Sequence, residues 1–218
     1  MASHDRTAIA DQLNAARLAI SNTLADDELL SLVAAYGYGA ARLGEGQRLY
    51  DAAVAAVDAR VAASGAARLA TAQAHAAERR AWASYQALAQ LARAVFQHEP
   101  ARSTTLGLVG HTPRGTSGFL AAAGTLFANA LGVAPIGATL ADYGYDAARL
   151  ERELAVVRAF DQAYRAQVVA FGAARRATSE RRAALAALSR WVAQYLKIAR
   201  IALRDQPTLI EKLGIGAV

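Results

Sequence analysis

The apolar positions of two segments recur at alternating steps of four and three residues. This spacing places one apolar side chain per turn on the same face of an α-helix, and it is typical of helices that pack as coiled coils. The first series is Leu29, Val33, Tyr36, Ala40, Leu43, Gln47, Tyr50, Val54, Val57 and Val61. The second series is Ile136, Leu140, Tyr143, Ala147, Leu150, Leu154, Val157, Asp161, Tyr164 and Val168. The pattern predicts long amphipathic helices with one polar break in each seam.

A glycine interrupts each series, at Gly37 and at Gly144, and it leaves two interpretations open. Glycine often follows the last residue of a helix because it adopts left-handed backbone angles without strain, and Asp146 suits the N-cap of a new helix. Both features favour a short helix that ends near Tyr36 or Tyr143. The unbroken spacing of the apolar positions favours one continuous helix instead.

The chain begins with a predicted helix over residues 5–23, whose apolar side chains at Ile9, Leu13 and Ile20 share one face. The acidic residues 26–28 then lie where the dipole at the N-terminus of a helix favours negative charge. We therefore expect shorter helices before each long one.

Gly65 and Gly172 are predicted to turn the chain from one long helix into the next. Two helices that face each other across a tight turn form an antiparallel hairpin. Pro100 and Pro207 are expected to end the last helices, and the tails after them to fold back onto the bundle. The predicted fold is an all-α antiparallel bundle of long helical hairpins with shorter N-terminal helices.

A single ungapped offset of 107 residues relates the two halves of the chain. Alanine matches occur by chance in so alanine-rich a chain, but matches of Tyr, Gly, Arg and Pro remain after these are discounted. Residues 36–38, 40–43, 65–68, 100 and 106–108 match residues 143–145, 147–150, 172–175, 207 and 213–215. We predict a tandem duplication, with repeats at residues 1–107 and 108–218 that form one pseudo-two-fold bundle.

The composition supports a helical protein and excludes some chemistry. Of the 218 residues, 55% are hydrophobic, only 4 are proline and none is cysteine. The absence of cysteine excludes disulfides, thiolate metal sites and a cysteine nucleophile. The N-terminal segment lacks the basic and apolar pattern of a secretory signal, so a cytoplasmic, soluble protein is expected.

Few residues suggest catalysis, a cofactor or a metal. His75 and Glu78 have the spacing of a helical metal-binding pair, but the second repeat has Arg182 and Leu185 at the matching places. Residues 110–117 resemble a phosphate-binding loop in spacing, with Thr116 where the lysine is required. A surface salt bridge and a plain linker are the favoured interpretations, and we expect no enzyme, no cofactor and no metal.

The last long helix is basic, and its arginines are candidates for binding anions. The net charge of the chain is +6, and the candidate anion-binding residues are Arg175, Arg176, Arg181 and Arg182. Such a stripe can bind nucleic acid or an anionic membrane. No recognition motif accompanies it, so the sequence does not favour nucleic acid as a partner.

Residues 115–141 carry no charge, which has three explanations. The stretch is a candidate interface, most simply of a homo-oligomer, because an exposed apolar face on one repeat alone is typical of a binding surface. Additional burial inside the chain and a membrane span are the alternatives, the membrane being disfavoured. The candidate interface residues are Phe119, Leu126, Phe127, Leu131 and Val133.

Four tyrosines at matching places of the two repeats are candidates for lining a ligand pocket. They are Tyr36, Tyr38, Tyr143 and Tyr145, with Trp82, Tyr85, Trp191 and Tyr195 as further members. Helical bundles hold ligands between their helices. Ordinary packing of tyrosine, with its hydroxyl turned to water or backbone, is the alternative.

The pattern Y-G-Y-x-A-A-R-L, followed by a long alanine-rich segment and a terminal Leu-Gly-Ile, resembles a family of uncharacterised bacterial proteins with two such helical units. The resemblance covers most of the chain and implies the fold, but it implies no activity and no site. The sequence therefore favours a non-enzymatic, self-associating interaction or scaffold protein. A small-molecule-binding bundle with a tyrosine-lined pocket and a nucleic-acid-binding protein are the alternatives.

Overall fold

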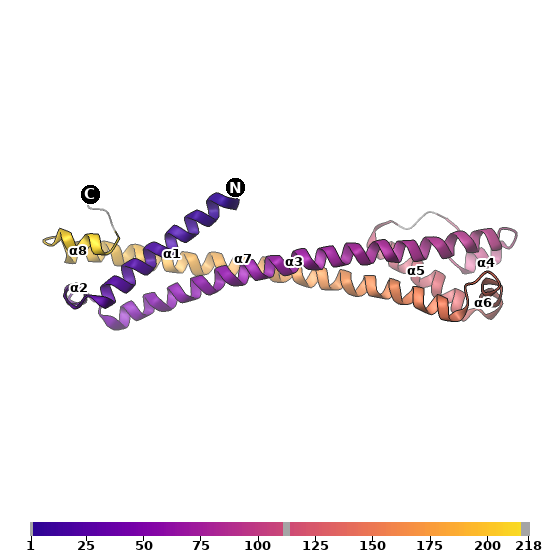
Figure 1. Cartoon of the computed structure of the whole chain (residues 1–218), viewed down its shortest axis with the longest axis horizontal. Coiled ribbons are helices and arrows are strands. Elements are labelled where there is room, and N and C mark those ends of the chain that lie inside the picture. The colour runs from indigo at the N-terminus through magenta and orange to yellow at the C-terminus, as the bar shows by residue number, and fades with distance from the viewer. Residues whose placement is uncertain (1, 111–113, 215–218) are drawn as a thin grey trace. The chain divides into compact units, whose positions relative to one another are not determined.

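The computed structural model describes residues 2–110 and 114–214, with side chains from residue 7 onward. These residues form α-helices joined by short connections, and the all-α prediction is confirmed (Figure 1). The helices are α1 (Ala2–Ala25), α2 (Asp27–Ala34), α3 (Ala40–Val95), α4 (Pro100–Thr105), α5 (Gly115–Gly132), α6 (Ala134–Ala141), α7 (Ala147–Ala202) and α8 (Pro207–Lys212).

The two Tyr-Gly-Tyr segments break the chain between a short and a long helix. Gly37 and Gly144 have φ angles of 85° and 81°, in the left-handed region that glycine adopts without strain. Asp146 caps α7, because its Oδ1 accepts a hydrogen bond of 2.7 Å from the backbone N–H of Arg149. The interpretation that the glycines end the short helices is confirmed.

Asp26 caps α2 in the same way and adds a contact to the C-terminal end of the chain. Its Oδ1 accepts a hydrogen bond of 3.1 Å from the backbone N–H of Leu29, and Lys212 on α8 lies 2.6 Å from its Oδ2. These two bonds, that with Lys212 above all, hold the pKa of Asp26 below its usual range. The acidic start predicted for this helix is confirmed.

The predicted turns at Gly65 and Gly172 are wrong. Helices α3 and α7 run through them without interruption, each over 56 residues, and Figure 1 shows both as continuous ribbons. A glycine inside a helix costs about 1 kcal/mol relative to alanine, a penalty that the many alanines around it easily offset. No hairpin therefore forms within either repeat.

Pro100 and Pro207 begin short helices and do not end the long ones. Both lie in the first turn of a helix, α4 or α8, where the missing N–H has no partner to lose. Helices α3 and α7 end earlier, at Val95 and Ala202. The tails after α4 and α8 do fold back, since Leu106, Leu108 and Leu213 are buried. Residue 215 lies outside the described part.

The chain divides into two compact units that do not coincide with the sequence repeats. The first unit contains residues 1–64 and 173–218, and the second contains residues 65–172. Each unit takes one part of α3 and one part of α7, because these helices continue through Gly65 and Gly172. The boundary expected between residues 107 and 108 falls inside the second unit.

The core of the second unit lies where α5 covers α3 and α7. Phe119 of α5 stacks on Trp82 of α3, with ring centroids 4.2 Å apart, and contacts Phe160 of α7 at 5.9 Å. The largest buried side chains of this core come from all three helices: Tyr85, Leu88, Phe96, Phe119, Leu126, Phe127, Leu150 and Phe160.

The core of the first unit contains an aromatic cluster of Tyr38, Trp191 and Tyr195. The centroid of the Tyr38 ring lies 5.9 Å from that of Trp191 and 5.1 Å from that of Tyr195. The hydroxyl of Tyr195 is hydrogen-bonded to that of Thr23 on α1. Burial raises the pKa of Tyr195 above its ordinary value.

Candidate interaction surface

The four repeated tyrosines are divided between the two compact units, two in each. Tyr38 is buried in the core of the first unit and Tyr145 in that of the second, whereas Tyr36 and Tyr143 are exposed. A ligand pocket at these tyrosines stays a prediction. The two buried rings pack as core residues, each with an arginine of the following turn over its face.

The arginine over Tyr145 belongs to a small polar cluster. The guanidinium of Arg149 lies 3.8 Å from the ring centroid, and its Nε donates a hydrogen bond of 3.0 Å to Glu153. Burial raises the pKa of Tyr145, and the nearby charge of Glu153 adds to this. This cluster of Tyr145, Arg149 and Glu153 lies at the start of α7.

The candidate interface residues of the uncharged stretch lie inside the second unit. Phe119, Leu126 and Phe127 are buried, and Leu131 and Val133 are half-buried against the same core. The expectation that this stretch exposes an apolar face is therefore corrected. Its lack of charge reflects additional burial, because α5 and α6 cover α3 and α7.

The same stretch is the one that the sequence offered as a possible membrane span. In the described part of the chain, no single helix is long and apolar enough to cross a bilayer. Helices α5 and α6 reach the necessary length and composition only as a pair, and that pair is bent by 89°.

The four candidate anion-binding arginines do not form one stripe. All lie on α7, where successive residues are rotated by about 100°. Arg175 and Arg182 share one side of the helix, whereas Arg176 and Arg181 point to other sides. Arg175, Arg176 and Arg182 are exposed, and Arg181 is half-buried. The arrangement does not concentrate the four charges on one face.

His75 and Glu78 form an exposed pair on α3, with Nδ1 and Oε2 3.4 Å apart. Among residues 7–110 and 114–214, no group of three or more His, Asp or Glu side chains is arranged to hold a metal ion. Residues 111–113 of the phosphate-loop-like segment lie outside the described residues.

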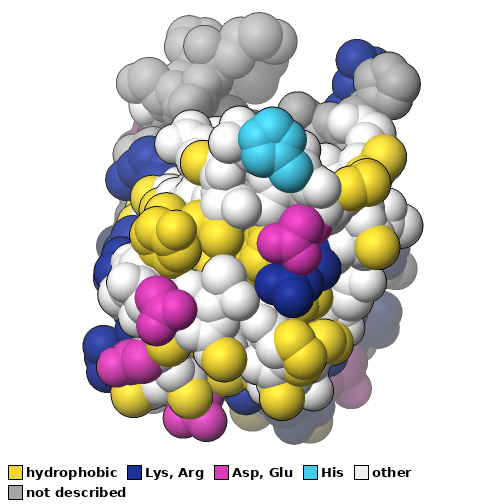
Figure 2. Space-filling view, turned by 90° about the vertical axis from the view of Figure 1, so that its right-hand side faces the viewer, with side chains coloured by type: hydrophobic (Ala, Val, Ile, Leu, Met, Phe, Trp, Pro, Cys, Tyr) yellow, Lys and Arg dark blue, Asp and Glu magenta, His cyan; other side chains and the backbone are white. Residues whose placement is uncertain are grey.

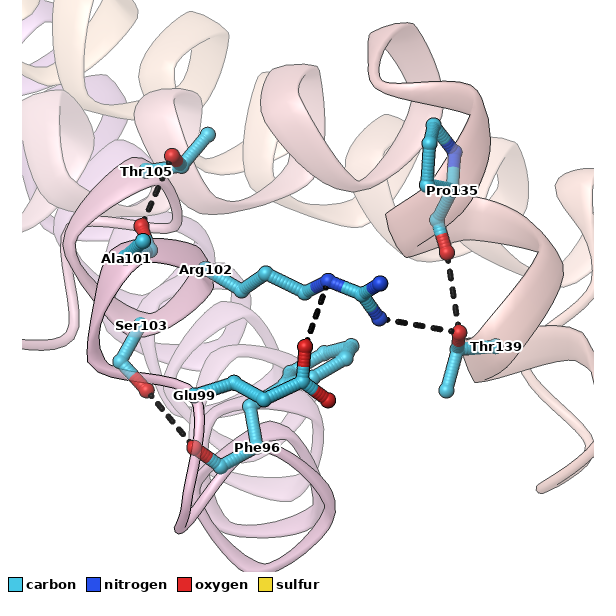
Figure 3. Close-up of polar contacts among 8 residues, drawn as sticks. All are labelled: Phe96, Glu99, Ala101, Arg102, Ser103, Thr105, Pro135 and Thr139. Atoms are coloured by element: carbon cyan, nitrogen blue, oxygen red, sulfur yellow. Dashed lines mark hydrogen bonds and ion pairs between the residues drawn. The ribbon is translucent and has the colours of Figure 1, made fainter.

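A polar cluster ties α4 to α6 at one end of the second unit (Figure 3). Arg102 lies 2.8 Å from the carboxylate of Glu99 and donates a hydrogen bond of 3.3 Å to Thr139. Its guanidinium lies 5.5 Å from the ring centroid of Phe96. These contacts connect α4 to α6. Because Arg102 is already paired with Glu99, Thr139 and Phe96, the cluster is typical of a structural contact between helices.

The end of the second unit with α4 and α6 faces the viewer in Figure 2. Hydrophobic side chains lie there in small groups, with charged and polar ones between them. The visible part of this face that the structure describes therefore offers no extended apolar patch of the kind that marks a binding surface.

An exposed apolar stripe lies instead on α7, in the second unit. Tyr164, Val168 and Phe171 are spaced four and three residues apart on one face of the helix, and they are 37%, 55% and 46% exposed. They continue the series whose earlier members Leu150 and Val157 are buried in the core. We call these three residues the α7 stripe.

The α7 stripe lies next to the part of α7 that α5 covers. Helix α5 runs from Gly115 to Gly132. The first large side chain of α5, Phe119, covers Phe160 on α7. The stripe begins one turn beyond Phe160, where its side chains are no longer covered.

Comparison of the chain with protein-family models, with curated proteins and with solved structures gives no match. The resemblance to the two-unit bacterial family stays a prediction, and no activity can be carried to this chain from a relative.

The sequence contained a signal for the α7 stripe, but it was interpreted as an internal seam. The regular apolar spacing through Val168 predicts that this face of α7 packs against another helix. It does not identify the partner helix. The signal that distinguishes the two cases is the start of α5, because Gly115 follows the proline- and glycine-rich segment and not a long helix.

Proposed function

We propose that this chain is a non-enzymatic helical interaction protein whose docking surface is the α7 stripe. The observation that supports the proposal is the exposure of Tyr164, Val168 and Phe171 in a heptad series that elsewhere packs inside the protein. Side chains with this spacing insert between those of a facing helix. Contiguous apolar surface of this kind is typical of interaction sites in soluble proteins.

We also propose that the chain arose by duplication of one helical module. Helices α2 and α6, α3 and α7, and α4 and α8 begin and end 107 residues apart. The duplication explains why the α7 stripe has a counterpart on α3: Val57 and Val61 stand where α7 has Tyr164 and Val168. Val57 is packed near α1, so only the second unit keeps the longer exposed series.

The proposed docking surface can be tested by placing a photo-cross-linking amino acid, benzoylphenylalanine, at position 168. The matched control carries it at position 169, which is also a valine, is 69% exposed and points about 100° away around the same helix. We expect irradiation in an extract of the source cells, or of the purified chain, to give a defined adduct from position 168 and much less from position 169.

Equal labelling from the two positions, or no adduct from either at high micromolar concentration, would contradict the proposal. In that case the α7 stripe would be no more than an exposed apolar surface.

A further inference from the structure

We propose that the two repeats, residues 1–107 and 108–218, are complementary binding partners, and that two copies of this chain assemble by exchanging them. In the exchanged pair, the first repeat of each copy packs against the second repeat of the other copy. The α7 stripe takes no part in this contact, so the inference goes beyond the docking surface proposed above. Its support comes from contacts inside each compact unit, taken separately.

Each compact unit is itself a contact between the two repeats. The first unit takes residues 1–64 from the first repeat and residues 173–218 from the second. The second unit takes residues 65–107 from the first repeat and residues 108–172 from the second. Neither repeat therefore contains all the segments of either unit, and each unit is completed by the other repeat.

The two units use equivalent positions for one of these contacts. In the first unit, Nδ2 of Asn22 on α1 donates a hydrogen bond of 2.6 Å to the backbone carbonyl of Lys212 on α8. In the second unit, Nδ2 of Asn129 on α5 donates one of 2.5 Å to the carbonyl of Thr105 on α4. The offset of 107 residues relates the two donors and also the two acceptors. In each unit, the first helix of one repeat thus binds the last helix of the other.

A second pair of equivalent positions differs in chemistry between the units. In the first unit, Nε2 of Gln12 on α1 donates a hydrogen bond of 2.6 Å to Oγ of Ser189 on α7. In the second unit, the equivalent residues are Phe119 and Trp82, which stack at 4.2 Å. A pair of two first repeats would place Gln12 beside Trp82, and the stack would be lost. A pair of two second repeats would place Phe119 beside Ser189, and the hydrogen bond would be lost.

The sizes of two side chains favour the same pairing of unlike repeats. In the first unit, a Cβ on Gly46 would overlap carbon atoms of the Trp191 ring. Glu153 is the equivalent of Gly46, so two second repeats would bring a larger side chain against that ring. Ser84 is the equivalent of Trp191, so two first repeats would leave the volume of the ring unfilled. The first repeat therefore fits the second better than either fits its own kind.

A second copy of the chain supplies both complementary repeats at once. Residues 106–114 join the repeats, between the end of α4 and the start of α5, so exchange between copies retains every contact described above. Exchange of identical elements is a low-cost route to dimers. The chain's own second repeat competes at the high effective concentration that a short connection gives. We therefore expect exchange when chains fold together at high concentration.

Single cysteines in different copies test the exchange, because the chain has none of its own. Full-length chains with Asn22→Cys and with Lys212→Cys are unfolded in urea, mixed, refolded together at high micromolar concentration and treated with a short bismaleimide. We expect a covalent pair of chains. Thr105→Cys, at the position equivalent to 212, should give at least about tenfold less product with Asn22→Cys, because that link needs two first repeats to pair.

Two controls accompany the experiment. One chain carrying N22C/K212C should link internally, which shows that the two positions are within reach, and Q12C with S189C repeats the test at the other contact. Adding Val168→Glu to both chains should leave the yield within about twofold, because the α7 stripe is not part of the exchanged contact. Circular dichroism of each variant shows that the helices are retained.

Two results would overturn the inference without affecting the docking surface. Internal links in the single chains, without a covalent pair of chains at either contact, would exclude exchange. Equal yields with K212C and T105C would show that the repeats do not distinguish each other. Loss of the covalent pair on Val168→Glu would assign the association to the α7 stripe and would also contradict the exchange.

Discussion

Gly46 is buried under the indole ring of Trp191, and the two residues fit only as a pair. A Cβ added at Gly46 would overlap three carbon atoms of that ring. The offset of 107 residues relates Gly46 to Glu153 and Trp191 to Ser84, so the second unit has a larger residue in place of the glycine and a smaller one in place of the tryptophan. This pairing of a small and a large side chain cannot be recognised from the sequence alone, because the sequence does not show that residue 46 on α3 faces residue 191 on α7.

This packing predicts opposite effects for the same substitution two residues apart. Gly46→Ala should lower the free energy of unfolding by about 1–3 kcal/mol, because the methyl group has to displace an aromatic ring. Gly44→Ala should raise it by about 0.5–1 kcal/mol, since nothing lies within 4 Å of the new Cβ and alanine is the better helix former. Urea denaturation of both variants measures the difference, and destabilisation of equal size at both positions would contradict the packing.

At the scale of the helices, the apolar spacing predicted where helices lie but not how they pair. The predicted breaks at Gly37 and Gly144 are correct, because two neighbouring features agree there: glycine suits the end of the short helix, and Asp146 suits the N-cap of the next. The predicted turns at Gly65 and Gly172 are wrong, because glycine alone was taken as the signal. The candidate interface failed for a similar reason: absence of charge indicates burial, and burial inside the chain looks the same as burial by a partner.

Substitution by alanine distinguishes a glycine inside a helix from a glycine with a positive φ angle. Gly65→Ala should stabilise the protein by about 0.5–1 kcal/mol, because Gly65 lies inside α3 with open space around its Cα. Gly37→Ala should destabilise it by about 1–2 kcal/mol, because its φ of 85° is costly for a residue with a Cβ. Thermal or urea unfolding of the two variants measures both signs, and a loss of stability in the Gly65 variant would indicate a turn at that position.

At the scale of the whole molecule, each compact unit combines segments from both predicted repeats. The first unit combines residues 1–64 with 173–218, and the second takes residues 65–172 from the middle of the chain. The repeat offset can be found in the sequence, because finding it requires only matching residues. The division into units cannot be predicted from the sequence, because it depends on α3 and α7 continuing through Gly65 and Gly172, where turns were expected.

The continuity of α7 through Gly172 is the central claim, because the sequence predicts a turn at this glycine and the helix instead runs from Ala147 to Ala202. The chain has no cysteine, so two introduced cysteines can be spin-labelled without any background. Ala159 and Ala186 are exposed and lie on either side of Gly172. Pulsed electron–electron resonance should give a distance of about 40 Å, the length of 27 residues of α-helix. A distance of about 20 Å or less would show that the chain folds back at Gly172, and it would contradict the account.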